Sequence, residues 1–178
     1  MQRMANVDPS TAATPTSEAT FADLLKPLIE PGFRLALAML HDAQAAEDAV
    51  QEASFTAWRK LGRMQDPNRL RPWFLGVVAN KCRNARRNKW TSDVSLGVPD
   101  ELAVVSNEER ALRGADLRRA IARLGHDDRL VVVLYFYLDM PVDEVATVAG
   151  SSVGATRARL YRAIKKLRPS VAVEEAMR

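Results

Sequence analysis

One stretch of sequence, residues 91–110, lies between two long regions in which apolar side chains recur at helical spacing. On both sides of this stretch the apolar residues follow the period of an α-helix buried on one face, and no segment shows the alternation of a half-buried strand. The stretch itself mixes Ser, Asp, Gly and Pro, which is typical of a linker. The 178-residue chain is therefore expected to be all-α, with two small helical domains joined by a flexible linker.

Composition places the boundaries of the predicted domains. Residues 1–19 are rich in Ala, Thr, Ser and Pro without periodicity, so we expect a disordered leader there. The first helical domain is predicted over 20–90, followed by the acidic linker over 91–110. The second helical domain is predicted over 111–170, followed by a short tail over 171–178.

Helix start signals divide the first domain into four predicted segments. Pro31 can serve as the first residue of a helix, so the apolar run after it is expected to form a helix separate from the one before it. Asp42 is a plausible N-cap for the next helix. The predicted segments cover residues 21–29, 31–41, 43–60 and 70–89.

Four further segments are predicted in the second domain, over 112–124, 128–138, 142–149 and 153–167. His126 or Asp127 is expected to cap the second of them, Ser151 or Ser152 to cap the fourth, and Pro169 to end it. The run VVVLYFYL has high strand propensity, but its helical neighbours offer no sheet, so we expect a buried helix.

The last two segments have the proportions of a helix-turn-helix with a tight turn at Gly150. Helical spacing predicts an inward face of Val142, Val145, Ala146, Ala149, Val153, Leu160, Ile164 and Leu167. It leaves outside Arg157, Ala158, Tyr161, Arg162, Lys165 and Lys166. Arginine can donate two hydrogen bonds to guanine in the major groove, so this outward face fits duplex DNA. A basic helix that only packs against its domain is the alternative.

Charge is distributed unevenly along the chain. Residues 1–90 carry 13 basic and 9 acidic side chains, residues 91–110 carry 1 and 5, and residues 111–178 carry 12 and 8. The positive charges cluster at 81–89 and 157–168, and such clusters suit a polyanion because each neutralised phosphate releases counterions. A solvated helix face is the alternative explanation for either cluster.

Several classes of protein are excluded. One cysteine cannot form an intrachain disulfide, and with two histidines it cannot complete a four-ligand zinc site, so no metal or cofactor is expected. The run Val131–Leu138 is far shorter than the roughly 20 residues of a membrane span. The start of the sequence does not resemble a signal peptide, so we expect a cytoplasmic protein.

Enzymatic motifs are not found in the sequence either. It contains no phosphate-binding glycine loop, no HExxH and no nucleophile elbow, so the chain is not expected to be an enzyme. Cys82 falls on an apolar helix stripe and is expected to be a buried, inert thiol. His126, between Gly125 and two aspartates, is interpreted as a neighbour of a helix cap.

Two motifs, in this order, are similar to one known family. DAQAAEDAVQEASFTAWRK with RPWFLGVVANKCRNARR resembles the N-terminal region of extracytoplasmic-function (ECF, group IV) sigma factors of bacterial RNA polymerase. LGHDDRLVVVLYFYLDMPVDEVATVAGSSVGATRARLYRAIKKLR resembles their C-terminal promoter-binding region. The resemblance covers roughly residues 20–170. It implies an alternative sigma factor that binds core RNA polymerase and directs promoter-specific transcription initiation.

The resemblance assigns residues to three surfaces. It implies that polymerase is bound by Asp48, Gln51, Glu52 and Phe55. It implies that the proximal (−10) promoter element is bound by Arg63, Arg69, Asn80, Arg83, Asn84 and Arg87. For the distal (−35) element it implies Ser152, Ala155, Arg157, Ala158, Arg159, Tyr161 and Arg162, while Lys165 and Lys166 are expected on phosphate. Trp73 either stacks on DNA or belongs to the core, and we favour the core.

Some residues depart from the family pattern. Gly125 stands where proline is common, and Ser151 and Thr156 stand where apolar side chains are usual, which leaves the packing of the turn in question. Relatives are often held inactive by an anti-sigma factor, but nothing in the sequence identifies such a partner.

The linker sets a geometric limit on the two promoter elements. About 20 residues reach at most ~70 Å, so the elements should lie within about 20 base pairs of each other. A free-standing helix-turn-helix regulator is the alternative function, and it predicts tight DNA binding by the isolated protein. A sigma factor should bind promoter DNA weakly until polymerase joins it.

Overall fold

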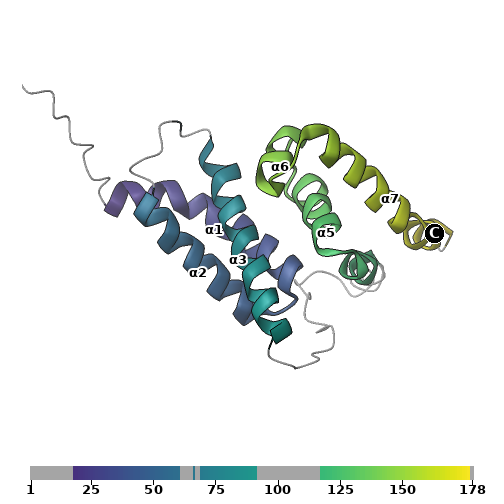
Figure 1. The fold of residues 1–178 in the computed structure, drawn as a ribbon, viewed down its shortest axis with the longest axis horizontal. Coiled ribbons are helices and arrows are strands. Elements are labelled where there is room, and N and C mark those ends of the chain that lie inside the picture. The colour runs from purple at the N-terminus through teal and green to yellow at the C-terminus, as the bar shows by residue number, and fades with distance from the viewer. Residues whose placement is uncertain (1–17, 61–65, 67–68, 92–116, 177–178) are drawn as a thin grey trace, which may run out of the picture.

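The computed structural model describes residues 18–60, 66, 69–91 and 117–176. Each regular element in these ranges is a helix (Figure 1). The described ranges leave out residues 1–17 of the predicted leader, residues 92–110 of the predicted linker, the side chains of the tail and most of the loop after Lys60. Residues 18 and 19, which were predicted to be disordered, are helical. Within the described ranges no helix is both long and apolar enough to cross a membrane.

The helices form two sets, which are separated in sequence by the linker. The N-terminal set consists of α1 (Glu18–Leu40), α2 (Ala43–Lys60) and α3 (Leu70–Thr91). The C-terminal set consists of a helical stretch at 117–123, α5 (His126–Val132), the π-helix η3 (Val133–Tyr137), α6 (Val142–Ala149) and α7 (Val153–Ala176). The all-α fold predicted from the sequence is confirmed.

The prediction of a break before Pro31 is wrong, because α1 continues through both Pro27 and Pro31. Each proline removes one backbone donor, which normally weakens a helix interior. Burial of Leu25, Leu28 and Leu35 on one side of α1 outweighs that loss. The neighbouring Gly32 keeps α1 close to α3, since a Cβ there would lie 3.1 Å from the Phe74 ring.

Helix α2 begins and packs as predicted. The Asp42 carboxylate accepts a hydrogen bond from the Ala45 amide at 3.0 Å, which caps the helix. The small side chains on one face of α2 are buried against α1 and α3. These residues are Ala46, Ala49, Val50, Ala53 and Ala57. Alanines allow close approach of the three helix backbones, so the opposite face of α2 is turned toward solvent.

The segment predicted as one buried helix over 128–138 is only partly so. After α5 the chain widens into η3, where the Leu138 amide donates to the Val133 carbonyl five residues back at 3.0 Å. Tyr135, Phe136 and Tyr137 lie in η3 and are exposed, so the prediction that this run is buried is wrong for them. The predicted side-chain cap of α5 is also wrong, because its N-cap is Gly125 without a side-chain bond.

The structure confirms the predicted turn of the helix-turn-helix, but the predicted inward face of its second helix is partly wrong. Gly150 adopts the left-handed conformation (φ 64°) that ends α6, and the Ser152 hydroxyl accepts from the Ala155 amide at 3.2 Å. Val153 and Ile164 were predicted to face inward, but both are exposed. The buried stripe of α7 instead consists of Thr156, Leu160, Ala163 and Leu167. Pro169 does not end α7, which continues to Ala176.

One hydrophobic cluster extends through both sets of helices. It joins Phe74 and Leu75 of α3 to Leu130 of α5, Val145 of α6 and Leu160 of α7. A second, smaller cluster in the C-terminal set contains Leu124, Val132, Ala163 and Leu167. Helix α6 packs on α3, and α5 contacts α1 (Figure 1).

Candidate nucleic-acid interface

The exposed face of α2 carries the residues predicted to bind polymerase. Asp48, Gln51, Glu52 and Phe55 are all exposed, and the Phe55 ring is 62% accessible. Their spacing places them on one side of the helix, opposite the buried alanines. Glu52 forms an ion pair with Lys81 of α3 at 2.9 Å, and the Arg59 guanidinium lies 5.8 Å from the centre of the Phe55 ring. This face therefore offers carboxylates beside an apolar ring.

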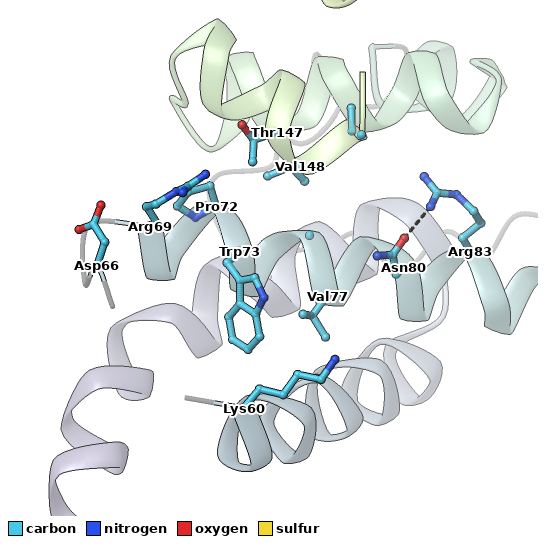
Figure 2. Close-up of a pocket in the computed structure, with 13 residues that line it drawn as sticks. Lys60, Asp66, Arg69, Pro72, Trp73, Val77, Asn80, Arg83, Thr147 and Val148 are labelled. Carbon is cyan, nitrogen blue, oxygen red and sulfur yellow. Dashed lines mark hydrogen bonds between the residues drawn. The ribbon is translucent and has the colours of Figure 1, made fainter. Parts of the chain in front are cut away.

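Half of the residues predicted to bind the proximal element come together at one cavity. Arg69, Asn80 and Arg83 line a hollow of about 720 Å³ beside α3 (Figure 2). Asn84 and Arg87 are exposed on the same helix but do not line it. Arg63 lies outside the described residues.

The cavity is basic and partly aromatic. Lys60 and Asp66 also line it, so three cationic side chains face one carboxylate there. The Arg83 guanidinium donates to the Asn80 amide oxygen at 2.6 Å, which fixes the amide with its NH₂ group free to donate. Such a site suits an anionic, hydrogen-bonding ligand such as a nucleotide of a single strand.

Trp73 has features of both interpretations made from the sequence, a core residue and a DNA-stacking residue. It is half-buried and packs against the main cluster, as expected of a core residue, but it also lines the cavity. In Figure 2 its ring is on the side of α3 that faces α2, away from Thr147 and Val148.

The outward face of α7 is accessible as predicted. Tyr161 is 71% exposed, and the exposed residues also include Ser152, Ala155, Arg157, Ala158, Arg162 and Lys165. Two predicted DNA-binding cations are instead engaged within the C-terminal set. Lys166 pairs with Asp128 at 2.7 Å, and the partly buried Arg159 lies 3.6 Å from Asp127. Both pairs tie α7 to α5.

The two unusual residues at the turn form a pair with each other. The Ser151 and Thr156 hydroxyls are 2.7 Å apart, and Thr156 is 1% exposed. A buried hydroxyl without a partner would be unfavourable, but here each satisfies the other. The departure from the family pattern therefore leaves the turn well packed.

Sequence analysis missed Arg129, the most connected buried polar residue described. It is 7% exposed and donates to the carbonyls of Ile121, Ala122 and Leu124, at the end of the 117–123 stretch. It also donates to the Met39 carbonyl at 3.3 Å and to His41 Nε2 at 2.7 Å, at the end of α1. Burial lowers the pKa of Arg129, with a further contribution from Arg86.

The surroundings of Cys82 and His126 indicate structural roles rather than reactivity. Cys82 is fully buried, and burial raises its pKa to about 12, as expected of an inert thiol. Burial also lowers the pKa of His126, whose Nδ1 lies 3.4 Å from the Asp127 carboxylate. Among the described residues, His, Cys, Asp and Glu nowhere gather in a group of three or more suited to a metal ion.

Comparison with known proteins assigns both sets of helices. Residues 24–91 match sigma-70 region 2 and residues 115–167 match sigma-70 region 4. The ECF RNA polymerase sigma factor SigL of Mycobacterium tuberculosis is 31% identical over 142 residues, which cover 76% of this chain and 80% of SigL.

Two further matches differ in what they cover. The probable RNA polymerase sigma factor RfaY of Xanthomonas campestris is 32% identical over 139 residues, which are 72% of this chain but only 34% of RfaY. The fold resembles sigma factor RpoE of Bartonella quintana, solved with the anti-sigma factor NepR, with a TM-score of 0.70. That match has 19% identity and covers 86% of this chain and 97% of RpoE. The chain therefore belongs to the ECF RNA polymerase sigma factors, which direct transcription initiation.

Proposed function

We propose that this chain is a group IV sigma factor that uses three separate surfaces, one for core RNA polymerase and two for promoter DNA. The observation that carries the proposal is the separation of exposed chemistry on three helices. Helix α2 presents carboxylates and Phe55, whereas α3 and α7 present arginines. The chain supplies no catalytic step of its own, and it acts in the cytoplasm, where polymerase and promoters are found.

Polymerase binding is assigned to the exposed face of α2. Carboxylates beside an apolar anchor suit a basic surface of the polymerase, because charge-assisted bonds give orientation and the buried ring gives affinity. The acidic residues are Asp48 and Glu52, and the anchor is Phe55.

Promoter recognition is divided between α3 and α7. The cavity beside α3, with Arg69, Asn80 and Arg83, is assigned to the proximal element, where an unstacked base could be accommodated. The N-terminal half of α7 is assigned to the major groove of the distal element, with Arg157 and Arg162 as base-reading side chains. Asn84, Arg87 and Lys165 are assigned to the DNA backbone.

The exposed face of α2 distinguishes a sigma factor from a free-standing DNA-binding regulator. A free-standing DNA-binding protein has no use for the exposed carboxylate and phenylalanine face of α2, and this face favours the sigma factor. An anti-sigma factor is a further proposed partner, because the similar RpoE structure contains one.

The test is run-off transcription with bacterial core polymerase on the DNA upstream of the chain's own gene. Arg162→Ala should reduce transcription by about fivefold or more, since a bidentate base contact contributes ~1–3 kcal/mol, while polymerase co-elution is unchanged. Glu52→Lys should abolish co-elution, with Asp23→Lys, an exposed site on α1, as the matched control. Equal loss of both activities in both variants would refute the division of surfaces. No start-site change with the wild-type chain would refute the function.

A further inference from the structure

Two cations of α7 lie at the border between its outward face and α5. Arg159 and Lys166 follow each other at an interval of seven residues, so they lie on the same side of the helix, about two turns apart. Arg162 lies between them on that side, at helical spacing from both. Arg159 and Lys166 therefore adjoin the surface that is proposed to bind the distal element.

Each of these cations is paired with a carboxylate in the first turn of α5. Lys166 Nζ lies 2.7 Å from the Asp128 carboxylate, and the Arg159 guanidinium lies 3.6 Å from that of Asp127. The Asp128 side chain is only 16% exposed, so its charge is poorly hydrated and depends on Lys166. Asp127 is more exposed and its other oxygen lies 3.4 Å from His126 Nδ1, so its pair with Arg159 is the weaker one.

The ion pairs are not what holds α7 on α5. That contact already has an apolar core, formed by Leu124, Val132, Ala163 and Leu167. Ion pairs with an exposed partner add little to the stability of such a contact, because water screens them. The main consequence of the two pairs therefore concerns the charge of the surface beside α7.

A DNA phosphate that approaches this edge of α7 meets cations that are already neutralised. To bind Lys166 or Arg159, the phosphate must displace a carboxylate of α5, which stays nearby and repels it. A neutralised cation also releases fewer counterions from DNA, and this release drives the binding that all sequences share. Base contacts by Arg157 and Arg162 depend on the sequence instead, so the carboxylates weaken the two kinds of contact unequally.

We propose that Asp127 and Asp128 act as internal competitors of DNA phosphate, and that they lower sequence-independent binding by α7 while leaving base reading by Arg157 and Arg162 intact. The two aspartates are then specificity-determining residues, because promoter choice depends on the ratio of specific to non-specific affinity. The inference rests on the proposed binding of duplex DNA by α7.

Asp128→Asn tests the proposal, because it removes the charge and keeps the size of the side chain. The measurement is fluorescence anisotropy of a short duplex of unrelated sequence, titrated with the full chain at several salt concentrations. One additional phosphate contact steepens the slope of log affinity against log salt by about 0.9, which amounts to about eightfold in affinity over about one decade of salt. We expect the variant to bind several-fold more tightly at low salt, with a gain that disappears as salt is raised.

Two further variants separate local competition from the loss of one negative charge. Asp143→Asn, at an exposed position in the first turn of α6, makes the same change of charge in the same set of helices and should leave the slope unchanged. Adding Lys166→Gln to Asp128→Asn should cancel the gained slope, because Lys166 is the cation that Asp128 neutralises. An equal gain in Asp143→Asn, or a gain that survives Lys166→Gln, would overturn the proposal.

Asp127→Asn provides an independent variant at a more exposed site, where a folding defect is not expected. It should produce a smaller gain than Asp128→Asn, because the Arg159 pair is longer. A purely structural role of the aspartates predicts lower stability in both variants and no gain in DNA affinity.

Transcription with core polymerase shows whether the competition affects promoter choice. An excess of unrelated duplex should inhibit the Asp128→Asn holoenzyme several-fold more strongly than the wild type. If Arg162→Ala reduces transcription as proposed while Asp128→Asn changes neither the salt slope nor this inhibition, the competition by carboxylates is refuted and the function of α7 stands. If Arg162→Ala has no effect on transcription, the proposed function of α7 fails and the inference fails with it.

Discussion

The two sets of helices obtain their stability in different ways. The N-terminal set has three long helices whose buried faces are apolar, with alanines between α2 and its neighbours. The C-terminal set is built from shorter elements, and its buried residues include Arg129 and Thr156. Its apolar side chains mostly join the cluster shared with the N-terminal set. The comparison shows that the C-terminal helices depend on polar contacts and on α3, whereas the N-terminal helices can rely on one another.

The largest effect is expected from Phe74→Ala, in the centre of the shared cluster. Phe74 is fully buried, so the change should lower the free energy of unfolding by about 3–5 kcal/mol. Denaturation followed by probes in each set should show both transitions shifted, because the cluster belongs to both. Phe136→Ala, at a site that is 57% exposed, is the matched control and should change stability by about 0.5 kcal/mol or less. A shift confined to the N-terminal set would contradict the shared core.

Arg129→Met should destabilise the C-terminal set more than the N-terminal set. It keeps an unbranched side chain but leaves buried carbonyls of both sets without their donor, so a loss of about 2 kcal/mol is expected. Hydrogen exchange should increase more in α5 and the 117–123 stretch than in α2. Arg123→Met, at an exposed position, controls for the loss of charge, and equal exchange in both variants would refute the role of Arg129.

A smaller effect is expected at the turn of the helix-turn-helix. Thr156→Val removes one partner of the 2.7 Å hydroxyl pair and should lower stability by about 1 kcal/mol. Ser151→Ala combined with Thr156→Val should recover part of that loss, because neither hydroxyl is then left unpaired. Thermal denaturation of the two single variants and the double variant measures the coupling. Strict additivity would show that the pair does not stabilise the turn.

The smallest effect is a weakening of the contact between the two sets of helices in acid. Burial and the charge of Arg129 lower the pKa of His41 to about 4, so the packed structure binds fewer protons at this site than a chain in which His41 is exposed and has its ordinary pKa. Burial, with Arg83 and Arg86, also lowers the pKa of His126, although Asp127 opposes this. The contribution of neutral His41 is complete above its ordinary pKa of 6.5 and is lost as the pH falls toward 4.

At about pH 5.5 the equilibrium constant for packing of the two sets should therefore be up to about tenfold lower than at neutral pH. Fluorescence energy transfer between labels at Gln44→Cys on α2 and Arg168→Cys on α7, both exposed positions, measures the change as a function of pH. His41→Asn should reduce the pH dependence, because asparagine does not titrate in this range. Asparagine also tolerates the positive φ of 54° at this site, so the backbone should be unchanged. An identical pH profile in the variant would exclude His41 as a cause.

Local signals predicted the local structure well. The Asp42 cap and the left-handed Gly150 depend on neighbouring residues, so the sequence was sufficient to locate α2 and the turn. The break before Pro31 was predicted wrongly, because packing of α1 against α3 overrides a local preference. The exposure of Tyr135 to Tyr137 could not be predicted either, since it depends on which face of the helix the other helices cover.

The candidate sites were predicted as faces of helices but not as contacts. Arg157 and Arg162 are exposed where helical spacing placed them. Arg159 and Lys166 pair with α5, which depends on how two helices cross and leaves no mark in their own segment. Arg129 reaches a carbonyl about 90 residues away, and no local pattern indicates such a partner. Contacts of this kind require the tertiary structure.

The distance between the two sets tests the account most directly. Fluorescence energy transfer between labels at Gln44→Cys on α2 and Arg168→Cys on α7, both exposed positions, reports it in single molecules. We predict one population of high transfer in the free chain and a shift to low transfer when core polymerase and promoter DNA are added. Low transfer in the free chain, or the same high transfer in the complete initiation complex, would contradict the account.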